Sequence, residues 1–328
     1  MDKKIKVAVL GSGGLGKSAA KIISQKKEMS LVAICDSQGY AYNKMGLNTN
    51  KIINLKSGES IKDIPEGKIS NDSIGEIIKL ASKIDGIFIA LPNLPNDFIP
   101  SVVNRFIKKN ASLVFTDALK RTRAAELMFK LNNKLKKCKS VYLVGCGATP
   151  GLLTGAAVLS AQSFIKIEKV NIWWGVGISN WEEYKATIRE DIAHLPGYSV
   201  EKARAMSDEE VKSLLDKTDG KLELHEMEHA DDILLERVGV VSIRNQVKVG
   251  GIMDTRNARK PVSTTMTLTG ITYDGQRSSH KFILGDETTM AANVIGPALG
   301  YMKKALWLKK QGIYGIFGST EFMPMVVK

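Results

Sequence analysis

The sequence has 328 residues, a length that suits two globular domains better than one, with the ordinary content of 44% hydrophobic and 25% charged residues. No apolar run reaches the roughly 18 residues of a membrane-spanning helix, so we expect no membrane partner, no signal peptide and a cytoplasmic protein. The net charge of +13 is spread over scattered lysines without interleaved aromatic residues, so we expect it to attract an anionic cofactor and a carboxylate substrate and not nucleic acid.

The first predicted elements form a strand–turn–helix–strand unit. The apolar run at 6–10 predicts a strand, 11–16 (GSGGLG) a glycine turn and 17–23 a helix, and a second strand at 31–35 ends on Asp36. This order is typical of a dinucleotide-binding βαβ unit, in which phosphates bind the free N–H groups at the start of the helix. The sequence therefore predicts an NAD site, with NADP as the alternative.

Particular residues of this unit have predicted roles. Gly11 allows the tight turn, Gly13 lets the backbone approach a pyrophosphate, and Gly16 lets the helix pack close to the strand. Asp36 is placed to accept hydrogen bonds from ribose hydroxyls, and its charge would repel the 2′-phosphate of NADP. The predicted cofactor-binding residues are Gly11, Gly13, Gly14, Leu15, Gly16, Asp36, Ser37, Leu91, Pro92, Asn93 and Gly147.

Residues 11–18 also match G-x-x-x-x-G-K-[ST], the phosphate-binding pattern of P-loop proteins. Two features favour the dinucleotide interpretation. Asp36 stands at the expected distance, and the strand at 86–91 runs into Pro92 and Asn93 instead of ending on a magnesium-binding aspartate. Lys17 is then an ordinary exposed helix lysine. A P-loop nucleotide-binding protein stays open as the second interpretation.

The remaining elements divide the chain into two parts. Up to residue 163, predicted helices (74–82, 98–110, 122–137, 152–163) alternate with strands (87–91, 112–115, 141–144), while 37–73 is predicted as loop and surface excursion. This alternation predicts a Rossmann-type doubly wound parallel sheet over 1–155. From about residue 166 the pattern changes to strands at 170–177, 222–229, 238–243, 263–269 and 279–284, with helices at 181–191, 207–215 and 288–310 and a last segment at 312–318. It predicts a second α+β domain over 156–285 with a largely antiparallel sheet.

The turn at 145–153 (GCGATPGLL) resembles the one that leaves the nucleotide domain in saccharopine dehydrogenase-like reductases. Residues 306–321 resemble that superfamily's returning C-terminal helix and final strand, and Trp173 to Ser179 is similar to a tryptophan–glycine strand of meso-diaminopimelate dehydrogenases. Residues 36–47 resemble homoserine dehydrogenases. The resemblance implies that 286–328 packs back on the first domain and that the chain forms a homodimer.

The same resemblance implies an NAD(P)-dependent oxidation or reduction at a carbon next to an amine, imine or carbonyl, with a small amino or keto acid as substrate. Two departures keep the diaminopimelate substrate from carrying over. The chain has Ala148 and Thr149 where that enzyme has Trp-Asp, and Asp36 where it has serine and arginine for a 2′-phosphate.

Candidate catalytic residues follow the predicted strand at 112–115. Lys120 is predicted as general acid/base and Asp117 as the residue that orients it, because ligands of open α/β sheets bind at the carboxyl ends of strands. Trp174 is predicted to wall the substrate pocket, and Arg244 and Arg256 to bind a substrate carboxylate. The structural alternatives are a helix cap beside a solvated lysine, a core tryptophan and two surface arginines.

Residues 225–229 (HEMEH) match the zinc motif H-E-x-x-H, which needs both histidines on one face of a helix. Leu222 and Leu224 alternate with charged residues and predict a strand instead, so we expect no metal. A substrate-side role for one histidine stays open. A non-catalytic NAD(P)-binding sensor is the alternative to an enzyme.

Overall fold

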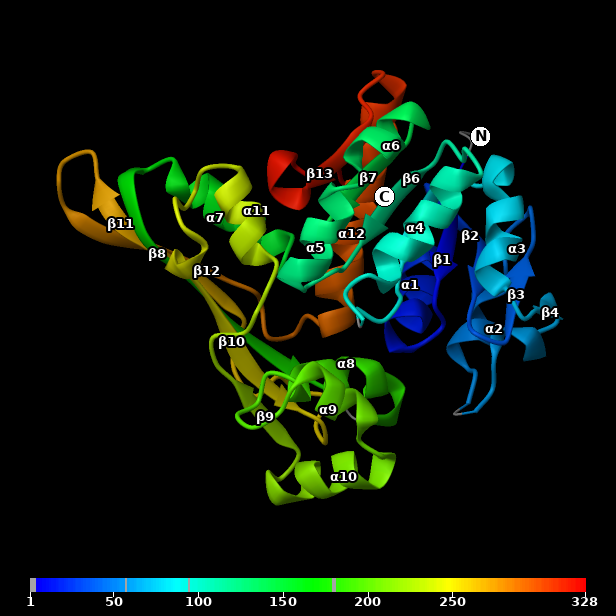
Figure 1. The fold of residues 1–328 in the computed structure, drawn as a ribbon, viewed down its shortest axis with the longest axis horizontal. Helices are drawn as coiled ribbons and strands as arrows, with labels where there is room; N and C mark the ends of the chain where they lie inside the picture. Colours follow the sequence, from blue (N-terminus) through cyan, green and yellow to red (C-terminus); the bar gives the residue numbers. More distant parts are fainter. Residues whose placement is uncertain (1–3, 57, 94, 179–180) are drawn as a thin grey trace.

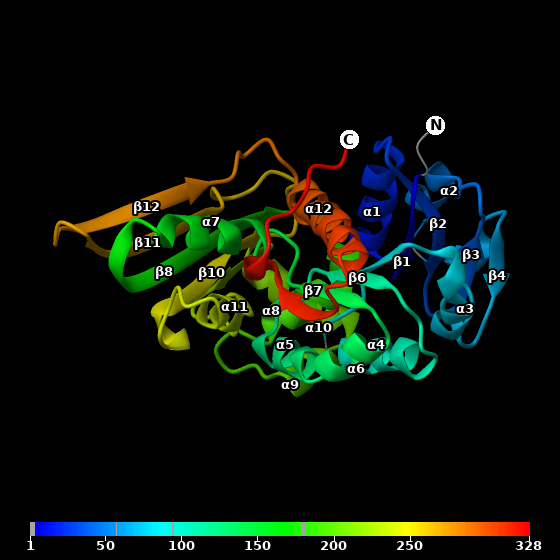
Figure 2. The same ribbon diagram turned by 90° about the horizontal axis from the view of Figure 1, so that it is seen from above.

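The computed structural model describes residues 4–56, 58–93, 95–178 and 181–328 (Figures 1 and 2). Ser179, the last residue of the tryptophan–glycine resemblance, lies outside the described residues. Two sheets organise the chain, one built mainly from its first half and one from its second. No helix among the described residues is both long and apolar enough to cross a membrane.

The first sheet has eight strands in the order β13-β7-β6-β5-β1-β2-β3-β4. All neighbours from β13 to β2 pair in parallel, and β3 and β4 add an antiparallel edge. The strands are β1 (Ile5–Leu10), β2 (Met29–Cys35), β3 (Gly39–Tyr42), β4 (Gly67–Ile69), β5 (Gly86–Ile89), β6 (Val114–Asp117), β7 (Val141–Val144) and β13 (Gly315–Gly318).

Helices cover both faces of this sheet because its central strands are apolar on both sides. Along β1, Val7 and Val9 join one buried cluster, whereas Ala8 and Leu10 join the other. The first cluster is completed by α1 (Gly14–Ser24) and α12 (Met290–Lys310), the second by α3 (Ser73–Lys79), α4 (Phe98–Lys108) and α5 (Thr122–Phe129). Figure 2 shows α12 and α1 side by side on one side of the strands.

The second sheet has the order β12-β11-β8-β10-β9 and is antiparallel except between β8 and β10. Its strands are β8 (Phe164–Gly177), β9 (Lys221–Leu224), β10 (Val247–Asp254), β11 (Thr265–Thr272) and β12 (Arg277–Ile283). The helices that accompany it are α7 (Leu152–Ala161), α8 (Lys185–Ile192), α9 (Val200–Ala205), α10 (Asp208–Lys217) and α11 (Asp231–Arg237) (Figure 1). Ser207 caps α10 with the expected capping box to Glu210.

The predicted fold class is confirmed, including the return of the C-terminal helix to the first sheet. α12 packs against β5, β6 and β7, and β13 then pairs in parallel with β7. This returning segment closes the first cluster, because Leu299 and Met302 of α12 are fully buried there. The chain end therefore supports the domain with which the chain begins.

Two predictions in the second half are wrong. Residues 238–243 are not a strand, because α11 ends at Arg237 and Gly239 turns the chain with φ +75. The strand β10 was missed because Gly250 and Gly251 weaken its β-propensity. A Cβ at these glycines would lie 2.8 Å from the Trp173 ring and 2.3 Å from the Trp174 ring, so only glycine lets the tryptophans pack on β10.

Smaller differences concern the predicted loops and helix lengths. The excursion at 37–73 contains β3, α2 (Thr49–Ile53) and β4. The helix predicted at 122–137 is divided into α5 and α6 (Asn132–Lys137). The helix predicted at 181–191 starts as a 3-10 turn before α8, and the strand predicted at 222–229 ends with β9. None of these differences affects the strand–turn–helix unit that contains the glycine turn.

Candidate active site

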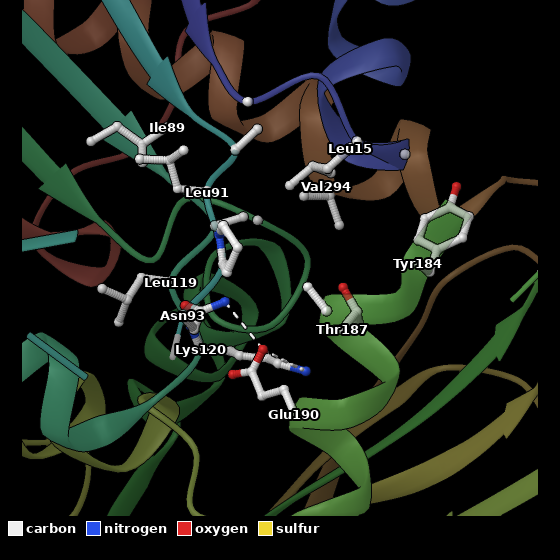
Figure 3. Close-up of a pocket in the computed structure, with 18 of the residues that line it drawn as sticks. Leu15, Ile89, Leu91, Asn93, Leu119, Lys120, Tyr184, Thr187, Glu190 and Val294 are labelled. Carbon is white, nitrogen blue, oxygen red and sulfur yellow. Dashed lines mark hydrogen bonds and ion pairs between the residues drawn. The ribbon is translucent and has the colours of Figure 1, made fainter. Parts of the chain in front are cut away.

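A cavity of about 740 Å³ lies where the carboxyl ends of β1, β5 and β6 face the second sheet and α8 (Figure 3). Its volume is typical of a site for a cofactor or small molecule. The first domain contributes the glycine turn and the loops after β5 and β6, and the second contributes Trp174, Thr187 and Glu190. The cavity is therefore a site that both halves of the chain complete.

The glycine turn forms one wall of the cavity. Gly11, Gly13, Gly14 and Leu15 line it, whereas Gly16 lies beneath, where a Cβ would meet the Gly11 carbonyl oxygen at 2.0 Å. Gly11 has φ +105, which only glycine adopts easily. Around the Cβ position of Gly13 no atom lies within 4 Å, so this open cradle beside the start of α1 fits a pyrophosphate.

Lys17 does not behave as a P-loop lysine. Its ammonium donates a hydrogen bond to the Leu55 carbonyl, and neither Lys17 nor Ser18 lines the cavity. A P-loop lysine has to reach the phosphates of its nucleotide, so this geometry argues against the second interpretation of residues 11–18.

Asp36 and Ser37, which were predicted to bind the adenosine end of a dinucleotide, both line the cavity. Its carboxylate accepts hydrogen bonds from protein groups: the hydroxyls of Ser12 and Ser60 and the backbone N–H groups of Gln38, Gly39 and Ile61. The carboxylate thereby holds the glycine turn and the β2–β3 turn together. A ribose hydroxyl would have to share these oxygens with Ser12 and Ser60.

Lys120 is the central charge of the cavity. Its ammonium lies 2.5 Å from Asp191 Oδ1 and 3.6 Å from Glu190 Oε2, and the three side chains are 18%, 2% and 4% exposed. Asn93 bridges the two domains here, because it accepts a hydrogen bond from the Lys120 backbone N–H and donates one to Glu190 Oε2. Figure 3 shows Lys120, Asn93 and Glu190 converging from the two domains.

Burial and charge act in opposite directions on these groups. Burial alone would lower the pKa of the Lys120 ammonium, but Asp191 and Glu190 outweigh it and raise that pKa. Burial raises the pKa of Glu190, with Lys120 opposing and Asp191 adding to the rise. Lys120 is thus a protonated donor at neutral pH, beside a carboxyl group that retains its proton more readily than usual.

Asp117 does not orient Lys120. Its carboxylate is fully buried below the cavity, where it accepts hydrogen bonds from the Tyr142 hydroxyl at 2.6 Å and from the N–H groups of Gly145 and Leu119. Burial raises the pKa of Asp117 to about 6. Asp117 fixes the loops that follow β6 and β7, and Asp191 takes the orienting place that the sequence assigned to Asp117.

The histidines of the H-E-x-x-H motif are not on a helix. His225 is exposed, while His229 is buried and lines the cavity with Nδ1 2.6 Å from Asp231 Oδ2, at an angle unfavourable for a regular hydrogen bond. Asp231 also accepts hydrogen bonds from the hydroxyls of Thr149 and Thr154. No metal-binding cluster forms within the described part of the chain. The arrangement supports His229 as the histidine on the substrate side.

Of the three predicted substrate-binding residues, one lines the cavity and two do not. Trp174 lines the cavity and is 7% exposed. Arg244 pairs with Glu126 and Glu236, and neither it nor Arg256, which pairs with Asp216 and Asp219, lines the cavity. The two arginines therefore stabilise contacts between helices and loops, and the prediction that they bind a substrate carboxylate is wrong.

Of the other predicted cofactor residues, Leu91, Pro92, Asn93 and Gly147 line the cavity.

The residues that sequence reasoning missed come mainly from α8 and from the loop before β11: Thr187, Glu190, Asp191 and Lys260. The adjacent acids Glu190 and Asp191 were a possible signal, because they lie between the apolar Ile188 and Ile192 and so next to a face that is expected to be buried. Nothing in the sequence pairs them with Lys120, about 70 residues earlier, because that contact depends on how the domains meet.

Comparison with known proteins adds to this geometry. The family model for glutamate/leucine/phenylalanine/valine dehydrogenase matches residues 1–136. The (S)-8-amino-7-oxononanoate synthase BioU of Haloferax mediterranei is 42% identical, over 99% of each chain. The chain belongs to the BioU family. The match to the dehydrogenase model identifies the chain as an enzyme.

Solved structures show the same fold at low identity. An engineered D-amino acid dehydrogenase with bound NADP+ has a TM-score of 0.59 and 18% identity, covering 97% of this chain and 94% of its own. The diaminopimelate dehydrogenase of C. glutamicum, solved with DAP, has a TM-score of 0.58 and 17% identity, covering 97% and 93%. The BioU-family chain is thus an NAD(P)-dependent enzyme related to amino-acid dehydrogenases. The narrower resemblance to saccharopine dehydrogenase-like reductases stays a prediction.

Proposed function

We propose that the protein is an NAD(P)-dependent oxidoreductase that acts on an amino or oxo carboxylic acid at the carbon bearing the oxo or amino group. The observation that carries the proposal is the buried Lys120 ammonium between Asp191 and Glu190 in the cavity that the glycine turn opens. The relative named for (S)-8-amino-7-oxononanoate suggests this acid as substrate or product.

The cofactor supplies or accepts the hydride in such a reaction. When an oxo or imino carbon gains the hydride, its oxygen or nitrogen must gain a proton. Lys120 donates this proton from Nζ, and Asp191 holds the ammonium in place. Glu190 can return a proton to Lys120, because its raised pKa lets it stay protonated closer to neutral pH. In the oxidative direction the same groups take up the proton.

The apolar part of the cavity keeps water from the reacting carbon. Leu119, Trp174 and Met253 line it on the side of the second sheet and the loop after β6. A lowered local dielectric strengthens the contact between Lys120 and a developing negative charge on the substrate. His229, which lies beside Asp231, is a second polar group that lines the cavity.

The test is turnover of NADH and NADPH with (S)-8-amino-7-oxononanoate, followed by the absorbance of the reduced cofactor. Lys120→Met should lower the rate by roughly 10²-fold or more, with NADH affinity nearly unchanged. An unaltered rate in this variant would refute the role of Lys120. Borohydride treatment with substrate followed by intact-protein mass separates a further outcome: a stable adduct on Lys120 would show that its amine attacks the carbonyl and does not only move a proton.

We further propose a homodimer that forms through the edge strand β12. All residues of β12 are exposed, and its outer edge has no strand partner within the described residues. Such an edge presents unpaired N–H and C=O groups that a second copy can satisfy. Sedimentation velocity tests the proposal, and a monomer at micromolar concentration would contradict it.

A further inference from the structure

This inference rests on the proposed function and concerns how the protein binds the carboxylate of the substrate. A carboxylate bound in a largely apolar cavity needs a cationic partner. Among the described residues that line the cavity, the basic side chains are Lys120, His229 and Lys260. Lys120 already faces two carboxyl groups, and His229 faces Asp231.

Lys260 differs from these two because its hydrogen-bond partners are neutral. Its ammonium donates to the Gly285 carbonyl oxygen at 2.7 Å and lies 3.4 Å from the Thr288 hydroxyl. No ion pair to Lys260 occurs within the part of the chain that the structure describes. An ammonium has three N–H donors, so at least one is left for a ligand. Among the described residues, none forms an ion pair that balances its positive charge.

Two acidic side chains, Asp254 near Lys260 and Asp286 next to its partner Gly285 in the sequence, have other partners. Asp286 accepts a hydrogen bond from the Ser263 hydroxyl at 2.8 Å. Asp254 accepts hydrogen bonds from the backbone N–H groups of Arg256 and Asn257. Both carboxylates therefore stabilise the loops on either side of Lys260, and neither forms an ion pair with Lys260.

The surroundings of Lys260 are fixed and add to its positive potential. The preceding loop packs tightly on the end of β8, where a Cβ on Gly177 would meet the Arg259 carbonyl at 2.3 Å. The start of α12, a helix of 21 residues without an acid in its first turn, contributes Met290 and Asn293 to the same cavity. Its positive end therefore lies at the same cavity as Lys260.

We propose that Lys260 binds the carboxylate of the substrate and thereby selects a carboxylic acid whose reacting carbon lies at Lys120. The assignment replaces the predicted roles of Arg244 and Arg256, which are engaged elsewhere. The cofactor pyrophosphate is the competing anion for Lys260. The open cradle at Gly13 and the start of α1 already provides for that group.

The experiment compares (S)-8-amino-7-oxononanoate with its methyl ester in the unaltered enzyme and in Lys260→Met. We expect the ester and the variant each to raise KM roughly 10- to 100-fold, the usual effect of losing a charge-assisted hydrogen bond. Lys260→Met should not raise the KM for the ester further, and kcat should change little. Lys260→Arg should restore part of the affinity for the acid.

Lys248→Met is the matched control, because Lys248 lies in β10, the strand that precedes the loop of Lys260, pairs with Glu226 and does not line the cavity. An unchanged KM for the acid in Lys260→Met, or an equal rise for acid and ester, would overturn the inference. Weaker binding of NADH by Lys260→Met would assign the lysine to the cofactor instead.

Calorimetry with the acid in the presence of NAD+ separates this inference from the proposed function. If the unaltered protein binds the acid and Lys260→Met binds it about 10-fold or more weakly, the inference stands even when no turnover occurs. Turnover without any effect of Lys260→Met on binding would leave the proposed function intact and refute the carboxylate site.

Discussion

Replacing Asp191 by asparagine tests the buried charge group most directly. Lys120 Nζ lies 2.5 Å from Asp191 Oδ1, and burial opposes the charge of the ammonium. Asparagine keeps the shape and one acceptor but removes the negative charge, so only Glu190 would offset burial. The pKa of Lys120 should therefore fall, and the protonated donor should be lost at lower pH than in the unaltered enzyme.

The size of the effect follows from the depth of the pair. Breaking a buried ion pair costs about 3–5 kcal/mol, and we expect the lower end, about 3 kcal/mol of unfolding free energy, because asparagine still accepts a hydrogen bond. In the pH profile of kcat/KM for reduction, the alkaline limb should move to lower pH, so that the variant loses most activity in alkaline buffer.

The control is Asp208→Asn, which removes a carboxylate that pairs with Lys185 and Arg189 away from the cavity. It should leave the pH profile unchanged. If Asp191→Asn leaves the alkaline limb where it was, or moves it to higher pH, then Asp191 does not set the protonation of Lys120. In that case Lys120 is not the donor on which the profile depends.

Three further predictions concern the cofactor site and its support. Gly13→Val should abolish NADH binding in a fluorescence titration but leave the melting temperature unchanged, because the added Cβ meets open space. Gly16→Ala should lower the melting temperature, because its Cβ would meet the Gly11 carbonyl oxygen. Normal NADH binding by Gly13→Val would show that the phosphates bind elsewhere. The pKa of Asp117 is raised from 3.8 to about 6, so the stability that its protonated form contributes is present below 3.8 and lost as pH rises through 6. Urea denaturation should show a loss of about 3 kcal/mol from this group that Asp117→Asn abolishes, and equal pH dependence in both proteins would contradict the assignment. NADH should bind more tightly than NADPH because the Asp36 charge repels a 2′-phosphate, and tighter NADPH binding would show that Ser12 and Ser60 screen that charge.

The parts that the sequence predicted well are those whose signal is local. The glycine turn is recognisable because its conformation depends on residues within one strand, one turn and one helix, and Gly11 and Gly16 act on each other over five residues. The parallel sheet is recognisable from alternating apolar runs for the same reason. The sequence placed Lys120 after a strand end, and the structure shows that the loop after this strand lines the cavity; the catalytic role of Lys120 stays a prediction.

The partners of Lys120 could not be predicted, because they depend on tertiary contacts. Asp117 is nearer in sequence but lies beneath the sheet edge with Tyr142, whereas Asp191 reaches the lysine from another domain. The strand β10 was not predicted from the sequence for a similar reason. Its two glycines oppose strand formation locally, and only the packing of Trp173 and Trp174 explains them.

The charges in the cavity differ between Lys120 and Lys260, and this difference fits the proposed substrate class. One ammonium and two carboxyl groups stand together at Lys120, an excess of acid that favours a substrate bearing an amine. At Lys260 one ammonium has no carboxylate partner among the described residues, which favours an acid. A molecule that carries an amine and an oxo group near one end and a carboxylate at the other complements the charges at both Lys120 and Lys260, whereas a simple ketone complements neither. Substrates that lack the amine should therefore lose affinity through Glu190→Gln much less than amino-oxo acids do, and equal losses would show that Glu190 does not recognise the amine.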